Sequence, residues 1–548
     1  MTIHTATPTC PHPAPTGRPE DSRLRRTTLL SAAVVFALAS AFASAQESRL
    51  PDIGSSAGEL LTPHRQREYG SMMLAQLRHY DYTLEDPLIA SWLDTLGSRL
   101  AANSDRPQLP FTFFMLRERQ INAFATLGGY VGVNSGLVLA AEREDEVAAV
   151  LSHEIAHVTQ QHVLRAVERA QRDQLPILLA MLGAVVAAQA SGGTSADNAV
   201  QAAVVSGLGL MQQRQIDYTR SNESEADRIG IQTLARSHYD TAAMAGFFGT
   251  LNSRSRANRA GYYGETPGYL MSHPVTTTRI SEAKALAEQI ARAPAHFEAD
   301  IASDNPLLPS GLKIGSSVAG GGTGQFDYAR ERLRVLSADS PSDAIREYDR
   351  LAKGKPLNDA QRYGLAVAKL RANQGAGAAS MLAELLEKHP GDLWLSLALG
   401  EAEARSGKAD AADARFEAIL KSMPQNRPAA LTYARTLAER NSPAAGKRAQ
   451  AILRPLLGQS GEDPEFQQVF ARASEIAGDP VRAGEAYAES AYLNGRAEQA
   501  LVQLNTLRRR SDLDYYARAR IDARIAAITP TVLELKRQGI RDEDLQRH

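Results

Sequence analysis

The pentapeptide His153-Glu154-Ile155-Ala156-His157 has residue types and a spacing that suit metal-dependent hydrolysis. Side chains four residues apart lie on one face of a helix, so His153 and His157 can offer ring nitrogens to one ion. Glu154 would lie beside the metal rather than on it, where a general base for the hydrolytic water belongs. The apolar flanks favour a buried helix over residues 147–162. Because so short a pattern also occurs by chance, further ligands elsewhere in the sequence are needed to identify a metal site.

We expect a further ligand downstream, because two histidines do not complete a zinc site. Residues 220–230 read as helix, which places Glu223 and Asp227 on one face. One of these carboxylates could bind the metal while the other orients a ligand. Glu225 points about 200° away from Glu223 and is a poorer partner. Capping at the surface is the alternative interpretation of these acidic residues.

His162 follows His157 by five residues and invites comparison with the metzincin spacing. That pattern requires glycine three residues and histidine six residues beyond the second histidine. Gln160 and Val163 occupy these positions, so the metzincins are excluded. We therefore predict that His162 is a surface residue of the helix.

Several elements upstream of the pentapeptide must position it. Helical spacing covers residues 57–80 and 86–104, and the aromatic segment 110–116 suits a strand. Gly128-Gly129 predicts a turn, and residues 130–133 predict a short strand. This strand could pair with an extended peptide by edge addition, or it could belong to a purely structural hairpin.

Two apolar segments, residues 175–190 and 199–211, follow the predicted metal helix. The first is shorter than the roughly 20 residues that span a bilayer comfortably, and it contains Pro176. We favour a helical hairpin that is buried or covers the site. Peripheral membrane contact through residues 175–211 is the second alternative, and a true span is the third.

The N-terminal segment has the order of a secretory signal. Arginines precede an apolar run from Leu29 to Phe42, and Ala43-Ser44-Ala45 forms an A-x-A cleavage site. We predict that residues 1–45 are a signal peptide and that the chain is exported, most simply to a bacterial periplasm. An uncleaved anchor is the alternative. The single cysteine, Cys10, lies in this leader, so the mature chain would have no thiol catalysis, cysteine-ligated zinc or disulfide.

The composition of the 548-residue chain is that of a soluble globular protein with two or more domains. The formal net charge of −1 argues against a dedicated nucleic-acid binder.

The C-terminal half shows the period of a helical repeat. Pro390 and Pro424 are 34 residues apart, the tetratricopeptide (TPR) spacing, and residues 356–390 and 463–495 give looser copies with Gly375 or Gly478 at the inner turn. A generic helical bundle is the alternative. We therefore divide the chain into residues 46–314, a metalloprotease domain, residues 315–325, a Gly-rich linker, and residues 326–548, a TPR-like solenoid that could bind peptides or protein partners.

Five segments together resemble the zinc endopeptidase family of HtpX-type and CAAX-prenyl-protease-type enzymes. They are Asn122-Ala-Phe-Ala, the Gly128-Gly129 strand, His153-Glu-Ile-Ala-His157, Glu223-Ser-Glu-Ala-Asp227 and His273-Pro-Val-Thr-Thr-Thr-Arg279-Ile. The chain is most similar to the periplasmic branch. The resemblance implies a mainly α (α+β) fold, with a gluzincin-like metalloprotease domain that contains a small β-sheet, followed by the TPR-like solenoid.

The resemblance also implies the roles of individual residues. One Zn²⁺ per chain would be bound by His153, His157 and Glu223, with Glu154 as the base. Asp227 would complete the catalytic set by orienting a ligand. The predicted substrate-binding residues are Asn122, Gly129 and Tyr130.

His273 carries a further implication. In the periplasmic branch, a histidine before proline at this point can occupy the fourth zinc position and shut the site. An imidazole there would displace the water that Glu154 must activate. The alternative is that His273 only structures the turn before Pro274. Arg279 could pair with an acid near the site or steady the oxyanion.

Two functions follow from these patterns. The first is a periplasmic zinc endopeptidase that degrades misassembled outer-membrane proteins and assists their assembly, with outer-membrane proteins and the barrel-assembly machinery as partners by resemblance. The second is a TPR-based chaperone or assembly factor in which proteolysis is secondary. The intact Glu154 favours the first, because a pure scaffold would not need it.

Overall fold

A computed structural model describes residues 62–166, 219–260, 269–270, 273–292 and 322–537 of this chain. These residues belong to one compact unit, Ser56–His548. The predicted signal peptide, the apolar segments within 175–211 and most of the predicted Gly-rich linker lie outside the described residues.

The first two helices of the described residues are α3 (Pro63–His79) and α4 (Pro87–Ala102), which confirms the helices predicted from spacing. Each begins with proline after a capping side chain, because proline suits the first turn and the cap accepts an otherwise unpaired backbone N–H. The caps are Thr62 and Asp86. Helix α4 packs its apolar face, which includes Trp92 and Leu96, into the main core.

Three short strands form the sheet, in the order β1-β3-β2. Strand β1 (Thr112–Leu116) is parallel to β3 (Tyr130–Asn134), and β2 (Ala123–Ala125) is antiparallel to β3. The turn before β3 is the 3₁₀ segment η1 (Leu127–Gly129), with left-handed backbone at both glycines. A Cβ atom on Gly129 would lie 2.0 Å from the Pro110 carbonyl oxygen, so only glycine fits there.

This sheet order corrects one expectation. Residues 131–133 of β3 are paired with β1 on one side and with β2 on the other, so β3 has no free edge for a substrate strand. The edge strand on the side of helix α6 (Glu144–Thr159) is β2, which packs against that helix. Edge addition of a peptide would therefore involve β2.

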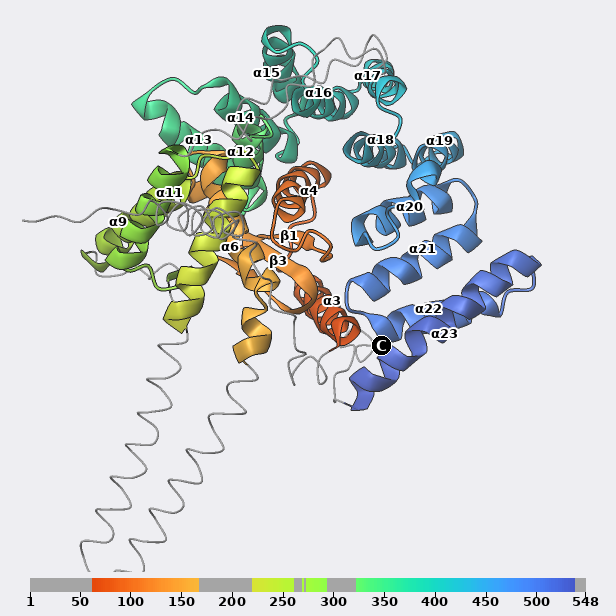
Figure 1. Ribbon diagram of the computed structural model, residues 1–548. Helices are drawn as coiled ribbons and strands as arrows, with labels where there is room; N and C mark the ends of the chain where they lie inside the picture. The colour runs from red at the N-terminus through yellow and green to blue at the C-terminus, as the bar shows by residue number, and fades with distance from the viewer. Residues whose placement is uncertain (1–61, 167–218, 261–268, 271–272, 293–321, 538–548) are drawn as a thin grey trace, which may run out of the picture. The chain divides into compact units, whose positions relative to one another are not determined.

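Helix α6 carries the pentapeptide and is buried along nearly its whole length. It follows the short helix α5 (Ser135–Ala140) and contacts α4, β2 and α9 (Ala243–Ala260). The helix over residues 219–236 and α11 (Thr277–Arg292) complete this part of the fold (Figure 1).

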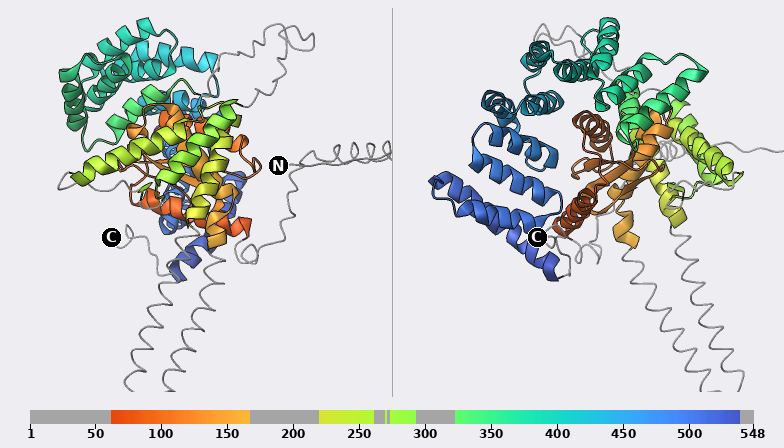
Figure 2. Two further views of the ribbon diagram at one scale, coloured as in Figure 1. Left: turned by 60° about the vertical axis from the view of Figure 1, so that its left-hand side comes forward. Right: turned by 180° about the vertical axis from the view of Figure 1, so that it is seen from behind.

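The remaining helices run in antiparallel pairs and form an arc around α4 and α3, as Figures 1 and 2 show. Contacts between α18 and α4 and between α21 and α3 join the arc to the N-terminal part. The helices are α12 (Phe326–Leu336), α13 (Pro341–Gly354), α14 (Asp359–Arg371), α15 (Gly375–Lys388), α16 (Leu393–Arg405), α17 (Ala409–Ser422), α18 (Arg427–Glu439), α19 (Pro443–Leu453), η2 (Arg454–Leu456), α20 (Pro464–Ile476), α21 (Pro480–Leu493), α22 (Ala497–Arg508) and α23 (Tyr515–Arg537). The predicted fold class is confirmed.

The repeat has a backbone signature as well as a period. Helices α14, α16 and α18 begin at residues 359, 393 and 427, which are 34 residues apart. The turn inside each pair needs one left-handed residue, supplied by Asn373, Gly407 and Asn441 at the same spacing. Gly478 has this role in a later pair, whereas Gly375 does not, because it begins helix α15 instead.

The first repeat helix is joined to the N-terminal part by buried polar groups. Thr323, at the end of the predicted linker, donates backbone and hydroxyl hydrogen bonds to the buried carboxylate of Glu144 at the start of α6. Arg332 on α12 makes two hydrogen bonds of 2.8 and 2.7 Å to the Asp86 carboxylate that caps α4. Burial alone would raise the pKa of Asp86, but the Arg332 guanidinium outweighs it and holds that pKa below its usual range.

No helix among the described residues is both apolar enough and long enough to cross a membrane.

Asp86→Asn should destabilise the folded chain strongly, because asparagine still caps α4 but leaves the buried Arg332 without its counter-charge. We expect a loss of about 3–5 kcal/mol in the free energy of unfolding near pH 7. Because the folded-state pKa of Asp86 is lowered, the wild-type advantage is complete above the ordinary carboxylate pKa and shrinks as pH falls below it. Urea unfolding followed by the fluorescence of the buried Trp92 and Trp394 measures it.

Asp392→Asn is the matched control, because Asp392 caps α16 in the same way. It should cost only a few tenths of a kcal/mol. Equal losses in the two variants would contradict the importance of the Asp86–Arg332 pair.

Candidate metal centre

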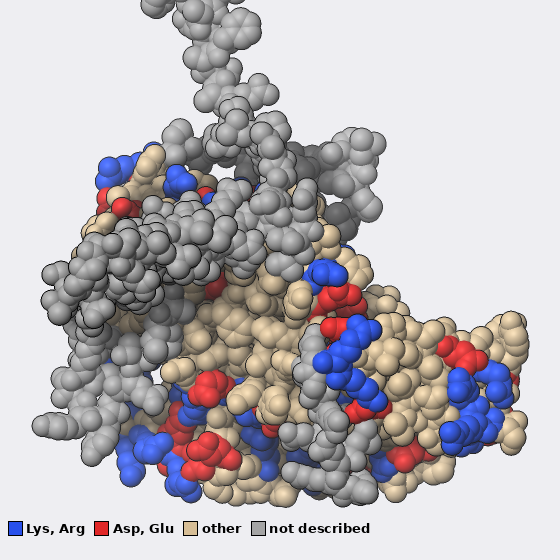
Figure 3. Space-filling view, turned by 90° about the horizontal axis from the view of Figure 1, so that it is seen from below, with Lys and Arg blue, Asp and Glu red and all other residues tan. Residues whose placement is uncertain are grey.

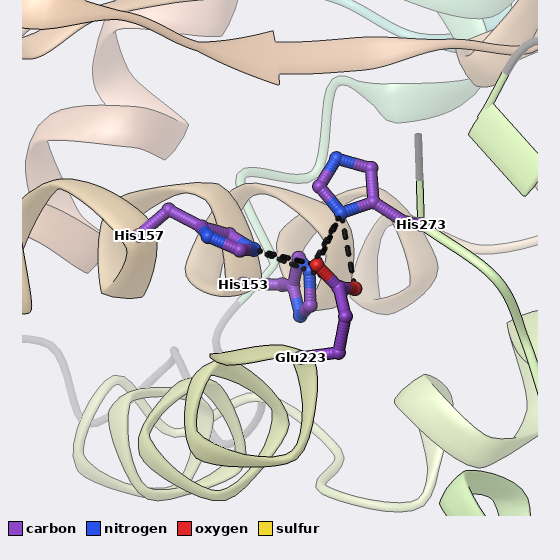
Figure 4. Close-up of side chains that lie close together, drawn as sticks. All are labelled: His153, His157, Glu223 and His273. Carbon is purple, nitrogen blue, oxygen red and sulfur yellow. Dashed lines mark hydrogen bonds and ion pairs between the residues drawn. The ribbon is translucent and has the colours of Figure 1, made fainter. Parts of the chain in front are cut away.

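Four side chains from three segments converge on one point (Figure 4). His153 and His157 come from α6, Glu223 from the helix over residues 219–236, and His273 from the segment before α11. One candidate ligand atom from each lies within 4.8 Å of all the others. The exposed fractions of His153, Glu223 and His273 are 0%, 3% and 9%. The structure therefore brings together all four residues predicted as zinc ligands.

The distances between these atoms suit one small cation. His153 Nε2 lies 3.0 Å from His157 Nε2 and 3.4 Å from Glu223 Oε2, and His157 Nε2 lies 3.5 Å from Glu223 Oε1. His273 Nδ1 lies 3.0 Å from Glu223 Oε1 and 3.4 Å from His153 Nε2. A tetrahedral zinc site with bonds of 2.0–2.1 Å has ligand atoms about 3.3–3.4 Å apart. Three imidazole nitrogens and one carboxylate therefore fit zinc in chemistry and in size.

A second carboxylate orients the first histidine. Asp227 Oδ1 lies 2.9 Å from His153 Nδ1, so the ring presents Nε2 to the centre. Arg279 makes two 2.7 Å hydrogen bonds to Asp227 and lies 2.9 Å from Glu223 Oε2. Burial opposes ionisation of Asp227, but the Arg279 guanidinium outweighs it and keeps the pKa of Asp227 low. Arg279 therefore pairs with acidic side chains near the site, which is one of its two predicted roles.

Glu154 is 1% exposed and lies beside the cluster. Its carboxylate accepts a hydrogen bond from the backbone of Ala125 in β2, and its Oε1 is 3.6 Å from His273 Nε2. Burial raises the pKa of Glu154, although the nearby His273 and His153 partly oppose this shift. A carboxyl group with a raised pKa, set next to a metal cluster, is suited to both accept and release a proton.

The prediction for His162 was wrong. Its side chain is buried, its Nδ1 lies 2.8 Å from His157 Nδ1 and its Nε2 lies 3.2 Å from Glu225 Oε2. Five residues on a continuous helix would turn the two side chains about 140° apart. Helix α6 ends at Thr159 instead, and Gln161 has a left-handed backbone (φ 56°) that turns His162 back toward His157.

Tyr269 was not predicted. It is fully buried, its ring stacks on His273 with centroids 4.7 Å apart, and it meets His153 edge-on at 6.4 Å. The His273 N–H donates to the Tyr269 carbonyl at 2.7 Å. The spacing of four residues between a tyrosine and the histidine before proline was the available signal in the sequence.

The three predicted substrate-binding residues have different surroundings. Asn122 precedes the edge strand β2, and its buried Oδ1 has no hydrogen-bond partner in the described part of the chain. Gly129 is fixed by its close approach to Pro110, and the Tyr130 ring packs against Gly70 of α3. Gly129 and Tyr130 therefore make structural contacts with Pro110 and with helix α3.

A small cavity of about 30 Å³ lies beside His157. Its walls include Ala125 and Thr126 at the end of the edge strand, Leu127 of η1, and Val158 of the metal helix. The cavity is therefore lined both by the end of the edge strand and by His157, one of the four clustered side chains.

Comparisons with known proteins agree with this arrangement. Residues 87–287 match the model of Peptidase family M48, a span that includes all four clustered residues. The chain is 32% identical over 507 residues to the beta-barrel assembly-enhancing protease of Yersinia pestis, covering 91% of this chain and 96% of that protein. It is 30% identical over 499 residues to the protein of that name in Escherichia coli K12, covering 91% and 94%. It is 26% identical over 213 residues to the mitochondrial metalloendopeptidase OMA1 of Schizosaccharomyces pombe, covering 39% and 55%.

The likeness to the two bacterial proteases extends beyond the matched family region into the helical repeats. Together with the buried cluster of histidines and carboxylates, this likeness settles the class of protein. The chain belongs to peptidase family M48 and is a metalloendopeptidase.

Proposed function

We propose that this chain is a zinc endopeptidase of the bacterial periplasm that degrades misassembled outer-membrane proteins and assists their assembly. The observation that carries the catalytic part is the buried group of His153, His157, Glu223 and His273 with Glu154 at its side. The part concerning outer-membrane proteins is supported by the names of the bacterial relatives, which describe enhancement of beta-barrel assembly.

In this proposal His153, His157 and Glu223 hold one Zn²⁺. When bound, the ion supplies Lewis acidity, which polarises the scissile carbonyl and acidifies the hydrolytic water. Asp227 and Arg279 keep His153 and Glu223 in place, because the guanidinium contacts both carboxylates. The donor set of nitrogen and oxygen atoms in a nearly closed pocket favours zinc over calcium or magnesium, which prefer all-oxygen sites.

Glu154 is the proposed general base and acid. It would take a proton from the attacking water and deliver it to the leaving amine. The raised pKa that burial gives this carboxyl helps the second transfer, because the protonated form then forms more readily. The Ala125 N–H holds the carboxylate at the end of β2, where an added substrate strand would present its carbonyl.

We further propose that His273 shuts the resting site. Its Nδ1 lies 3.0 Å from Glu223 Oε1 and its Nε2 lies 3.6 Å from Glu154 Oε1, so one imidazole would take the fourth ligand position and also approach the base. The stacked Tyr269 ring supports the imidazole in this orientation. The alternative, that His273 only orders the turn before Pro274, would explain its backbone bond but not its ring contacts.

The proposed compartment and partners rest on other features. Residues 1–45 have the order of a signal peptide, and the arc of repeats offers a long surface for protein partners. On the face in Figure 3, acidic and basic side chains lie side by side where residues are described, rather than forming one basic surface. This mixture suits protein partners better than nucleic acid.

A second candidate is a TPR-based assembly factor in which proteolysis is secondary. The long helical repeat favours it, because the twelve α-helices described between residues 326 and 537 contribute none of the four clustered residues. The two functions can coexist in one chain.

Glu154→Gln tests the catalytic proposal. The variant should bind zinc with wild-type stoichiometry but lose peptide hydrolysis by about 100- to 10,000-fold, the range that a general base contributes. Zinc content by elemental analysis and cleavage of unfolded outer-membrane protein measure the two effects. Cleavage at the wild-type rate would refute the role of Glu154, and absence of zinc from the wild-type protein would refute the metal site.

His273→Ala tests the closed resting state. Removing the imidazole should free the fourth position and raise basal cleavage about tenfold, as when a closed state holding nine molecules in ten is eliminated. His389→Ala, an exposed histidine on the repeats, is the control and should leave the rate unchanged. Unaltered or lower cleavage in the His273 variant would contradict the closed state.

Glu154→Gln also separates protease from assembly factor. We expect the variant to retain part of its ability to promote outer-membrane protein assembly, because the repeats are unaltered. Assembly in cells that lack the wild-type chain measures this. Complete loss would mean that assembly depends on cleavage.

A further inference from the structure

We infer that His162 and Glu225 are positioning residues that fix the tautomer and ring orientation of His157. The inference rests on the proposed metal site. His157 Nδ1 lies 2.8 Å from His162 Nδ1, and His162 Nε2 lies 3.2 Å from Glu225 Oε2. Glu225 is held in turn by Arg165 at 2.8 Å. These contacts form an unbroken series from His157 through His162 and Glu225 to Arg165.

A metal bound through His157 Nε2 would allow only one arrangement of protons along these hydrogen bonds. If His157 binds the metal through Nε2, the atom that faces the cluster, its Nδ1 must carry the proton. His162 Nδ1 then accepts that N–H, so the proton of His162 lies on Nε2 and is donated to the Glu225 carboxylate. Each contact then has one donor and one acceptor.

The two histidines of α6 are therefore held in similar ways. His153 is oriented directly by Asp227, which Arg279 neutralises. His157 is oriented by Glu225 through an intervening imidazole, and Arg165 neutralises that carboxylate. In both cases a carboxylate increases the electron donation of a ligand imidazole, directly or through one ring.

One helix supplies all three carboxylates. Glu223, Glu225 and Asp227 all lie on the helix over residues 219–236. Glu223 and Asp227 contact His153, whereas Glu225 contacts His162. The kink at Gln161 is what allows Glu225 to act, because it brings His162 into the gap between His157 and Glu225. The left-handed conformation of a glutamine costs energy that a straight helix would avoid.

The test measures zinc affinity in the full-length Glu154→Gln background, so that no cleavage is needed. Competition with a chelator should show a zinc Kd raised about 10- to 100-fold in His162→Phe, which keeps the ring volume and removes the acceptor. Glu225→Gln should raise Kd less, because the amide oxygen can still accept a hydrogen bond. Added to His162→Phe, it should have no further effect, because Glu225 acts through His162.

Asp105→Asn is the matched control, since it removes a different arginine–carboxylate pair, Arg236–Asp105 at 2.7 Å, and should leave zinc affinity unchanged. The inference is overturned if His162→Phe binds zinc as tightly as its parent, or if Glu225→Gln has the same effect with and without His162. Should His162→Phe fail to fold, Glu225→Gln decides alone: weaker binding at an unchanged thermal midpoint supports the inference, and unchanged binding refutes it. A parent that binds no zinc would instead refute the proposed metal site.

Discussion

The burial of helix α6 is the constraint on which the rest of the structure depends. Polar groups on a helix that is enclosed on nearly every side are costly to bury, and contacts from neighbouring elements reduce that cost. Asp227 faces His153, His162 faces His157, the backbone of β2 reaches Glu154, and Tyr239 with Thr323 contacts Glu144. The elements around α6 are thus arranged by the needs of its polar side chains as much as by apolar packing.

Much of the candidate site was predictable because its signals are local. The pairing of His153 with His157 follows from helical periodicity, and Glu223 from the same rule together with the family resemblance. His162 could not be placed in this way, because one left-handed residue at Gln161 reverses its direction. The free edge of the sheet was also missed, since the pairing of β3 with β1 joins strands that are not neighbours in sequence.

The repeats likewise combine features that the sequence predicted with features that it did not. Their 34-residue period and helical pairs were visible in the spacing of prolines and apolar residues, and the structure confirms them. The turn residue was harder to identify, because asparagine replaces glycine at Asn373 and Asn441. Asparagine tolerates the left-handed region better than other residues with a Cβ, so the geometric period persists where the glycine period does not.

Thr323 links the first repeat helix directly to helix α6. It stands where the chain enters the first repeat helix, and it donates two hydrogen bonds to Glu144, in the first turn of the helix that carries both histidines. Breaking these bonds would leave the buried Glu144 carboxylate with the Tyr239 hydroxyl but without both Thr323 donors, so separating the first repeat from α6 carries a cost in free energy. A displacement of the first repeat would therefore act directly on the first turn of α6, the helix that carries His153 and His157.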